Sequence, residues 1–486
     1  MKFVIKLFPE IIVKSRPVRK QFISQLRKNI KKILSAIIEQ PQVHGTWDRL
    51  EVDLKQDDYH LESQLIDILQ RTPGIEFILK VNTHQLSANV SNYMDEIAKI
   101  VVEQYKDKVE NKTFCLRAKR TGTHPFKSIE MERQIGGALY QNSNSAGVKL
   151  KNPEVLVQLE LKDDELFAVQ ERYDGLGGFP IGQQESCVSL ISGGFDSTVS
   201  SYLMIKRGIR THYLFFNLGG ITHEVGVKQV AHYLWEKYAS SHRVLFITIP
   251  FEPVVAEILN KVDQSQMGVI LKRMMLRVAD KVAEEFNAPA IVTGEAVGQV
   301  SSQTLTNLSV IDKVSNQLVM RPLIVMDKPD IVKLSRKIGT EEFAAVMPEY
   351  CGVISNKPTT RAKIEKIERE EGRFDFDILD KAFDDRKVEN IDQLYKSNMN
   401  IESIEIVNLP KKDDVIIDIR HPQELATKPL SLTKNEVLAI PFFKLQSSAD
   451  IKNDKTYLLY CDKGIMSQLQ AEELIEKGFN VKVYQP

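Results

Sequence analysis

The segment SLISGGFDSTVS, residues 189–200, decides the fold of the central part of the chain. Its apolar start is typical of a buried strand, and its polar end is typical of a helix that begins near Ser197. Between them, Gly193 and Gly194 allow backbone N–H groups to approach an anion closely. The positive end of the new helix points at the same spot. The segment therefore predicts a phosphate-binding loop between a strand and a helix.

The side chains of this loop favour pyrophosphate over a γ-phosphate. The chain lacks the G-x-x-x-x-G-K-[ST] pattern of the usual nucleotide loop. Ser192, Ser197 and Thr198 supply hydroxyl donors. Asp196 supplies a carboxylate, in a loop without lysine, that suits pyrophosphate bound with Mg²⁺ while AMP is transferred. A glycine turn that only joins strand to helix is the alternative, but the complete S-G-G-x-D-S string favours the phosphate loop.

The segments after the loop predict an open α/β domain. The strand-like stretches THYLFFN, RVLFITI and APAIVTG alternate with helical stretches. This alternation is typical of a parallel sheet with helices on both faces. Ligands of such a sheet bind at the carboxyl ends of its strands, where the phosphate loop lies.

Two later segments are candidates for contact with the nucleotide. Residues 271–286 place Lys272 and Arg273 at the start of a helix, where a cation could neutralise an α-phosphate. Residues 293–304, TGEAVGQVSSQT, follow a strand. They offer the nucleotide Gly294, Gln299 and Gln303. A solvated basic face and an ordinary turn are the alternatives for these two segments.

Residues 1–168 predict two small α+β modules before this domain. The first has a strand at its start, a helix at residues 15–38 and a second strand, DRLEVDL. The second module starts near residue 63 and ends with the strand VLVQLEL. Residues 172–184, RYDGLGGFPIGQQ, are rich in glycine and predict a linker.

Basic residues gather in these modules although the chain as a whole is neutral. Its 486 residues include 65 Lys and Arg and 65 Asp and Glu, so no overall field attracts nucleic acid. Residues 1–40 carry ten Lys and Arg against two acids. Residues 115–127 contain no acid and carry four candidate RNA-binding cations, Arg117, Lys119, Arg120 and Lys127. These segments can bind a polyanion locally, and a solvated basic face is the alternative.

The composition excludes several classes of protein. The N-terminus lacks the apolar core of a signal peptide, and no apolar run is long enough to span a bilayer. Four cysteines cannot form a disulfide framework in a chain of this size, which indicates a reducing compartment. We therefore expect a cytoplasmic protein without membrane contact.

Cys461 has the sequence surroundings of a reactive thiol. It ends the strand TYLLYC and precedes a helix, so N–H dipoles and the nearby Lys463 should favour the thiolate. Such a thiolate can accept a sulfur atom and hold it as a persulfide. A buried cysteine at a strand end is the alternative. Cys351 lies in a loop and alone would be inert, whereas Cys115 and Cys187 lie in apolar strands and are expected to fill the core.

Several segments resemble known domains. SGGFDS resembles the pyrophosphate loop of the ATP pyrophosphatase (PP-loop) family, and CLRAKRTGTHPFKSIEMERQIGGAL resembles the THUMP RNA-binding domain. DVIIDIRHPQE, residues 414–424, and the loop CDKGIMS resemble a rhodanese domain, although Met466 stands where arginine is frequent. The signature residues of the first of these two segments are Asp418, Arg420 and Glu424.

The order of these segments resembles the tRNA 4-thiouridine synthetase (tRNA sulfurtransferase) family over essentially the whole chain, and PEYCGV matches the family's second cysteine. The resemblance implies a multidomain α/β fold with a parallel-sheet PP-loop domain. The implied domains are a ferredoxin-like domain at residues 1–62, a THUMP domain at 63–168, a PP-loop adenylation domain at 178–395 and a rhodanese-like domain at 404–486.

The resemblance also implies the reaction. ATP would adenylate O4 of uridine 8 in tRNA, because attached AMP makes that oxygen a good leaving group. Sulfur from a Cys461 persulfide would attack C4 directly or after release as hydrosulfide, and a Cys351–Cys461 disulfide would complete the turnover. Asp196 joins the two cysteines as a catalytic residue. The implied nucleotide-binding residues are Leu190, Ile191, Ser192, Gly193, Gly194, Ser197, Thr198, Lys272, Gly294 and Gln303, and no residue is assigned as a ligand of a resident metal.

The implied cofactors are ATP and Mg²⁺, and the implied partners are tRNA, a cysteine desulfurase as sulfur donor and a thiol reductant. The family also supplies sulfur to the carrier protein of thiamine thiazole synthesis. A homodimer is also possible on the sequence, which does not fix the oligomeric state. Two other classes remain as alternatives. An ATP-dependent amide ligase would not need Cys461 or the basic modules, and a non-catalytic RNA-binding or sulfur-carrier protein would not release pyrophosphate from ATP.

Overall fold

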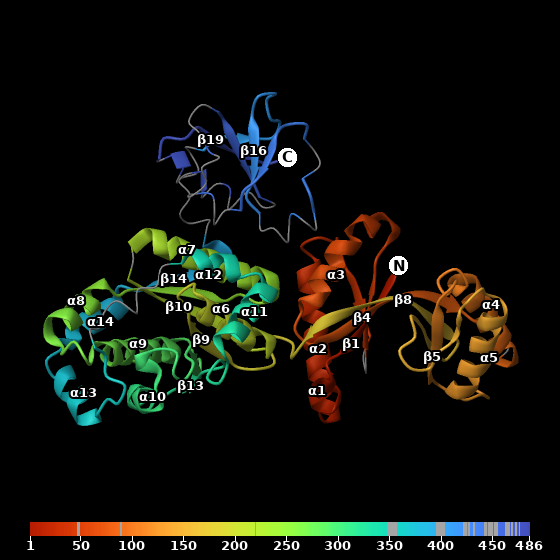
Figure 1. Ribbon diagram of the computed structural model, residues 1–486, viewed down its shortest axis with the longest axis horizontal. Helices are drawn as coiled ribbons and strands as arrows, with labels where there is room; N and C mark the ends of the chain where they lie inside the picture. The colour runs from red at the N-terminus through yellow and green to blue at the C-terminus, as the bar shows by residue number, and fades with distance from the viewer. Residues whose placement is uncertain are drawn as a thin grey trace. The chain divides into compact units, whose positions relative to one another are not determined.

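The computed structural model describes most of the chain, which forms two compact units, Met1–Pro180 and Ile181–Pro486 (Figure 1). The described residues are 1–45, 49–87, 90–218, 220–347, 357–394, 404–420, 425, 428–430, 433–441, 445, 451, 455–461, 467, 470–471, 474–475 and 477–486. Within them, no helix is long and apolar enough to cross a membrane.

The first unit is built on one eight-stranded sheet with the order β2-β3-β1-β4-β8-β7-β5-β6. Its strands are β1 (Lys2–Leu7), β2 (Gln42–His44), β3 (Arg49–Asp53), β4 (Ile75–Gln85), β5 (Thr113–Thr121), β6 (Gly147–Val148), β7 (Val155–Lys162) and β8 (Glu165–Gly177). Its helices are α1 (Pro9–Ile12), α2 (Arg16–Leu34), η1 (Gln56–Leu61), α3 (Glu62–Gln70), η2 (Val90–Asn92), α4 (Tyr93–Tyr105) and α5 (Ser128–Gln141).

Two hydrophobic cores form on this sheet. The first buries the apolar stripe of α2, for example Leu26 and Ile30, together with α3 and the start of β4. The second buries α4 and α5, which lie side by side against β5 (Figure 1). The helices therefore follow from apolar residues at three- and four-residue spacing, which produce one buried face on each.

The sheet corrects two expectations about the N-terminal modules. The predicted boundary between residues 62 and 63 separates segments that pack together, because Leu65 and Ile78 lie in the same core as α2. The predicted linker is wrong for residues 172–177, which continue β8 and pair with β4. Glycine in this stretch serves close packing, since a Cβ on Gly175 would lie 2.3 Å from the Ile75 carbonyl oxygen.

The second unit begins with the expected open α/β domain, whose sheet has the order β13-β12-β9-β10-β11-β14. All neighbours are parallel except β14, which runs antiparallel to β11 at the edge. The strands are β9 (Ser186–Leu190), β10 (Arg210–Asn217), β11 (Leu245–Pro250), β12 (Ala290–Val292), β13 (Leu318–Met320) and β14 (Lys387–Asn390). The helices are α6 (Phe195–Lys206), α7 (Gly220–Tyr238), α8 (Glu252–Lys261), α9 (Met267–Glu285), η3 (Ser301–Gln303), α10 (Leu305–Asp312), α11 (Lys328–Ile338), α12 (Glu341–Val346), α13 (Ile364–Glu371), α14 (Phe376–Asp384) and η4 (Ile391–Gln393).

The C-terminal part carries a third sheet of five parallel strands in the order β15-β19-β18-β16-β17. They are β15 (Ile406–Val407), β16 (Val415–Asp418), β17 (Val437–Ala439), β18 (Tyr457–Tyr460) and β19 (Val481–Tyr484). Three of these strands match the apolar stretches DVIIDI, TYLLYC and VKVYQ, and each of the three is almost wholly buried. Continuous apolar runs are typical of strands covered on both faces.

Candidate functional site

The predicted phosphate loop connects β9 to α6. Gly193 has a φ of 82°, a backbone conformation that side chains other than glycine rarely adopt. The loop is held in shape from within, because the Ser197 hydroxyl accepts from the Ser192 N–H at 3.1 Å and donates to the Gly194 carbonyl at 3.2 Å. Thr198 donates to the same carbonyl at 3.1 Å. The sequence pattern therefore forms the expected strand–turn–helix loop.

Asp196, in the first turn of α6, lies between two side chains from other segments. Its carboxylate accepts from Lys328 Nζ at 2.7 and 3.0 Å and from Gln299 Nε2 at 2.8 Å. Gln299 was predicted, whereas Lys328 was missed. The loop thus does have a lysine beside it, supplied by the first residue of α11. The signal that could have found it is its place shortly after β13, whose carboxyl end lies on the same edge of the sheet.

Gly294 allows the end of β12 to lie directly against the phosphate loop. A Cβ on Gly294 would lie 2.7 Å from the carbonyl carbon of Asp196 and 2.8 Å from the Ser197 nitrogen. Gln303 stabilises the segment that follows, because its buried Oε1 accepts from the Ala296 N–H at 3.2 Å. The two residues therefore shape the segment that packs against the phosphate loop.

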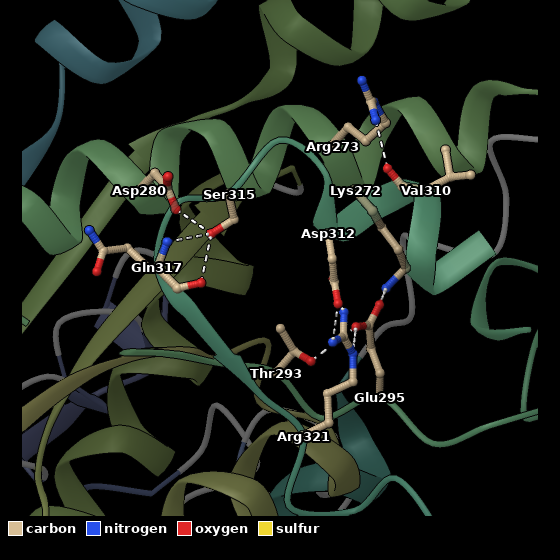
Figure 2. A network of polar contacts seen from close by, with 10 residues as sticks. All are labelled: Lys272, Arg273, Asp280, Thr293, Glu295, Val310, Asp312, Ser315, Gln317 and Arg321. Carbon is tan, nitrogen blue, oxygen red and sulfur yellow. Dashed lines mark hydrogen bonds and ion pairs between the residues drawn. The ribbon is translucent and has the colours of Figure 1, made fainter. Parts of the chain in front are cut away.

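A chain of alternating charges lies behind this segment (Figure 2). Lys272, in the second turn of α9, donates to Glu295 Oε1 at 2.8 Å, and Arg321 Nε donates to Glu295 Oε2 at 2.8 Å. Arg321 also donates to both oxygens of Asp312, at 2.9 and 2.5 Å. Burial alone would raise the pKa of Glu295, but Lys272 and Arg321 outweigh it and lower that pKa to about 2.

Arg273 does not have the predicted position for a phosphate contact. Its guanidinium is buried and donates to both oxygens of Glu371, at 2.6 and 2.8 Å, and to the Val310 carbonyl at 2.6 Å. It is not part of a solvated basic face either. It therefore stabilises the packing of α9 against α10 and α13, whereas its neighbour Lys272 pairs with Glu295.

Met347, at the end of α12, lies against the phosphate loop. A Cβ on Gly193 would lie 2.6 Å from Met347 Cε, and one on Gly226 would lie 3.1 Å from the same atom. The methionine therefore packs against the loop and α7. It is the last described residue before 348–356, so Cys351 lies outside the described residues.

Cys461 follows β18, is buried, and accepts a hydrogen bond from the backbone of Ser467. The Ser467 N–H donates to its Sγ at 3.4 Å, and the Ser467 hydroxyl lies 3.4 Å from the same sulfur. This agrees with the expected N–H dipoles around the sulfur. Lys463, Met466 and Glu424 lie outside the described residues.

Asp418 and Arg420 form a buried pair at the end of β16. Arg420 donates to the two carboxylate oxygens of Asp418 at 2.9 and 2.6 Å, and its guanidinium lies 4.9 Å from the ring centre of Tyr460. A buried charge pair that is hydrogen-bonded in this way holds the Arg420 side chain against the end of β16. The two signature residues, Asp418 and Arg420, therefore form an ion pair with each other.

The four predicted RNA-binding cations fall into two groups. Arg117 and Lys119 point away from the second core on β5 and are exposed, whereas Arg120 is on the other face and donates to the Gly122 carbonyl at 3.3 Å. Arg117 is partly neutralised by Glu132 at 3.2 Å. Lys127 is exposed just before α5. The helix α2 adds exposed cations at Lys20, Arg27, Lys28, Lys31 and Lys32.

Family models match most of the chain. One described as a ThiI ferredoxin-like domain matches residues 2–78, one described as a THUMP domain matches 91–167, and one described as thiamine biosynthesis protein (ThiI) matches 182–376. Curated relatives called tRNA sulfurtransferase, from Shewanella sp. (strain MR-4) and Shewanella pealeana, are each 51% identical over 489 residues and cover 100% of both chains. The relative of the same name from Colwellia psychrerythraea is 51% identical over 491 residues, again with 100% of both chains covered.

Solved structures agree with the fold. A 4-thiouridine synthetase–RNA complex with bound ATP superposes with a TM-score of 0.67 at 26% identity, covering 80% of this chain and 99% of that chain. A Pyrococcus horikoshii protein, PH1313, superposes with a TM-score of 0.52 at 19% identity, covering 70% of this chain and 100% of that chain. The second likeness supports the fold alone.

Proposed function

The chain belongs to the tRNA sulfurtransferase family, and we propose that it makes 4-thiouridine at position 8 of tRNA by adenylation of the uridine and sulfur transfer from Cys461. The observation that carries this proposal is the phosphate loop with Gly294 packed against Asp196 and Ser197. The hydrogen bond from the Ser467 N–H to the Cys461 sulfur supports the second half of the reaction.

In the first step the loop amides and hydroxyls would bind the phosphates of ATP, and Lys272 would neutralise charge at the α-phosphate. Uridine O4 attacks the α-phosphorus, and pyrophosphate leaves. We propose that Mg²⁺ would arrive with ATP and neutralise charge on its phosphates. The Asp196 carboxylate, which accepts from Lys328 in this structure, would hold the ion.

In the second step Cys461 would carry sulfane sulfur as a persulfide, Cys461–S–SH. Its terminal sulfur attacks C4 and AMP leaves with the former oxygen. The Cys351 thiolate then attacks the Cys461 sulfur, so that the S–S bond breaks, the terminal sulfur stays on C4 and a Cys351–Cys461 disulfide forms. Alternatively Cys351 releases hydrosulfide first, which attacks C4. In both routes a dithiol reductant supplies two electrons to restore the thiols.

The proposed partners follow from this chemistry. A cysteine desulfurase would supply the sulfane sulfur, and tRNA would bind through the basic parts of the first unit, as the structural neighbour was solved with RNA. Sulfur transfer to the carrier protein of thiazole synthesis would require Cys461 but not the phosphate loop. We propose a cytoplasmic location because each of these reactions needs reduced thiols. Whether two chains act together as a homodimer is a separate question.

The decisive experiment compares tRNA thiolation, by mass spectrometry of the bases, with pyrophosphate release. We expect Asp196→Ala to lose both activities. Cys351→Ala and Cys461→Ala should keep pyrophosphate release in a single turnover and lose multiple-turnover thiolation. Cys115→Ala, a buried cysteine in β5, is the control and should keep both.

Two outcomes would replace the proposal. Full activity of Cys461→Ala towards a small-molecule substrate would favour an amide ligase. Failure of the wild-type protein to release pyrophosphate in the presence of tRNA would favour a non-catalytic RNA-binding or sulfur-carrier protein.

A further inference from the structure

Glu295 is a buried carboxylate with three donors and no assigned role in the reaction. It accepts from Lys272 at 2.8 Å, from Arg321 at 2.8 Å and from the Thr293 hydroxyl at 3.0 Å. Only 5% of its surface is exposed. A buried anion with this many donors is fixed in place, because any movement of the carboxylate would leave a buried donor without its hydrogen bond.

The position of Glu295 ties it to the phosphate loop. It directly follows Gly294, whose Cα lies so close to Asp196 and Ser197 that no side chain fits between. On its other side Arg321 is fixed in turn by the two oxygens of Asp312. Figure 2 shows Lys272 and Arg321 approaching the carboxylate from two different segments. The carboxylate is therefore held by Arg321, by Thr293 and through the backbone of Gly294, while it accepts from Lys272.

Lys272 is the member of this chain that can reach a ligand. Its side chain is 24% exposed, compared with 7% for Glu295 and 9% for Arg321. A lysine ammonium on a four-carbon stem has many rotamers, so it binds a phosphate well only if something limits its position. The hydrogen bond from Nζ to Glu295 supplies that limit.

We propose that Glu295 is a positioning residue that holds the Lys272 ammonium beside the phosphate loop, so that the lysine meets the α-phosphate of ATP without first being ordered. This inference rests on the proposed function of Lys272. The charges of this network also cancel, because the two cations Lys272 and Arg321 pair with the two carboxylates Glu295 and Asp312. When ATP binds, its phosphates add negative charge at the exposed end of the chain, where Lys272 lies.

The other charged groups around α9 are engaged elsewhere. Glu371 on α13 pairs with Arg273 and Arg277, and Asp380 on α14 pairs with Lys281. Glu371 is the matched control for Glu295, because it is a buried glutamate that pairs with the residue next to Lys272. Its loss should weaken packing of α9 without moving the Lys272 ammonium.

The test is a double-mutant cycle on ATP binding, measured by calorimetry without RNA. We expect Glu295→Gln and Lys272→Met each to raise the Kd for ATP by about tenfold. If Glu295 acts through Lys272, the double variant should also lose about tenfold. Glu371→Gln should keep the Kd within about twofold of wild type while it lowers the melting temperature.

Multiplied losses, about a hundredfold in the double variant, or an unchanged Kd in Glu295→Gln would overturn the inference. If Glu295→Gln does not fold, the cycle is repeated with Glu295→Asp. This variant keeps the negative charge, but its side chain is one methylene shorter, so the carboxylate lies farther from Lys272. Glu295→Asp should raise the Kd in the wild-type background and leave it unchanged beside Lys272→Met. The proposed function can fail separately, since a chain that binds ATP but does not thiolate tRNA still gives a readable cycle.

Discussion

At Gly294 the end of β12 and the phosphate loop lie so close together that only a hydrogen atom fits between them. We predict that Gly294→Ala destabilises the protein by about 1–3 kcal/mol, because the new methyl group meets backbone atoms that cannot turn aside. Its distance to the Asp196 carbonyl carbon would be 2.7 Å. The measurement is urea unfolding together with the Kd for ATP, and both should worsen.

Gly137 is the control for this substitution. It lies inside α5, and a Cβ there would have no atom within 4 Å. Gly137→Ala should therefore stabilise the helix by about 0.5–1 kcal/mol and leave ATP binding unchanged. Equal stability of Gly294→Ala and wild type would show that the loop and the end of β12 can separate freely.

At the residue scale, the shape of the loop could be predicted from the sequence because one short string forms it. Gly193 has the positive φ of the turn, and Ser197 makes hydrogen bonds within the loop. Contact of these residues with a nucleotide stays a prediction. Lys328 could not be predicted, because it is 132 positions from Asp196 in the chain and reaches it only through the order of the strands. Arg273 was misassigned for a related reason: its buried partner, Glu371, comes from a helix 98 positions later.

On strand β10, the buried His212 is expected to make the stability of the sheet depend on pH. Its Nδ1 accepts from the Leu245 N–H at 3.0 Å at the start of β11. Burial, assisted by the charge of Arg210, lowers the pKa of His212 to about 4. The folded chain therefore keeps this imidazole neutral while the unfolded chain binds a proton below about 6.5, so stability is full above that pH and falls as the pH drops towards 4.

We predict that wild type loses about 2 kcal/mol of unfolding free energy through His212 between pH 7.5 and pH 5. His212→Gln keeps an acceptor but cannot be protonated, so its stability should change less over this interval. Urea unfolding at the two pH values is the measurement. An identical loss in both proteins would assign the acid sensitivity to other groups.

Strand β5 provides a sharper test of RNA binding than net charge does. Its alternation exposes Lys119 on the face away from the second core, whereas Arg120 points to the other face. We predict that Lys119→Ala lowers the slope of log affinity against log salt by about one for tRNA. Lys381→Ala on α14, an exposed lysine paired with Asp385, should leave the slope unchanged. A slope that moves equally in both variants would contradict a local RNA contact.

At the scale of the whole molecule, the sequence predicted the order of the first three domains, which the family models match, but not how the first two are joined. Apolar alternation identified the strands, and the glycines after residue 172 appeared to end the second module. The pairing partners of β4 cannot be predicted from its own residues. A strand of 11 residues is long enough to pair with a short strand over part of its length and with a longer strand over all of it. In the structure, β4 pairs with β1 and β8.

This shared strand predicts that residues 1–180 unfold as one cooperative unit. Leu26 is fully buried in the first core, so Leu26→Ala should cost about 2–5 kcal/mol. Because β4 and β8 continue from that core into the second, the loss should also appear in the second core, around Leu159. Hydrogen exchange of the β7 amides measures it. In Leu26→Ala these amides should exchange faster by the same free energy as those of β1, whereas unchanged protection of β7 would mean that the two modules unfold independently despite the common sheet.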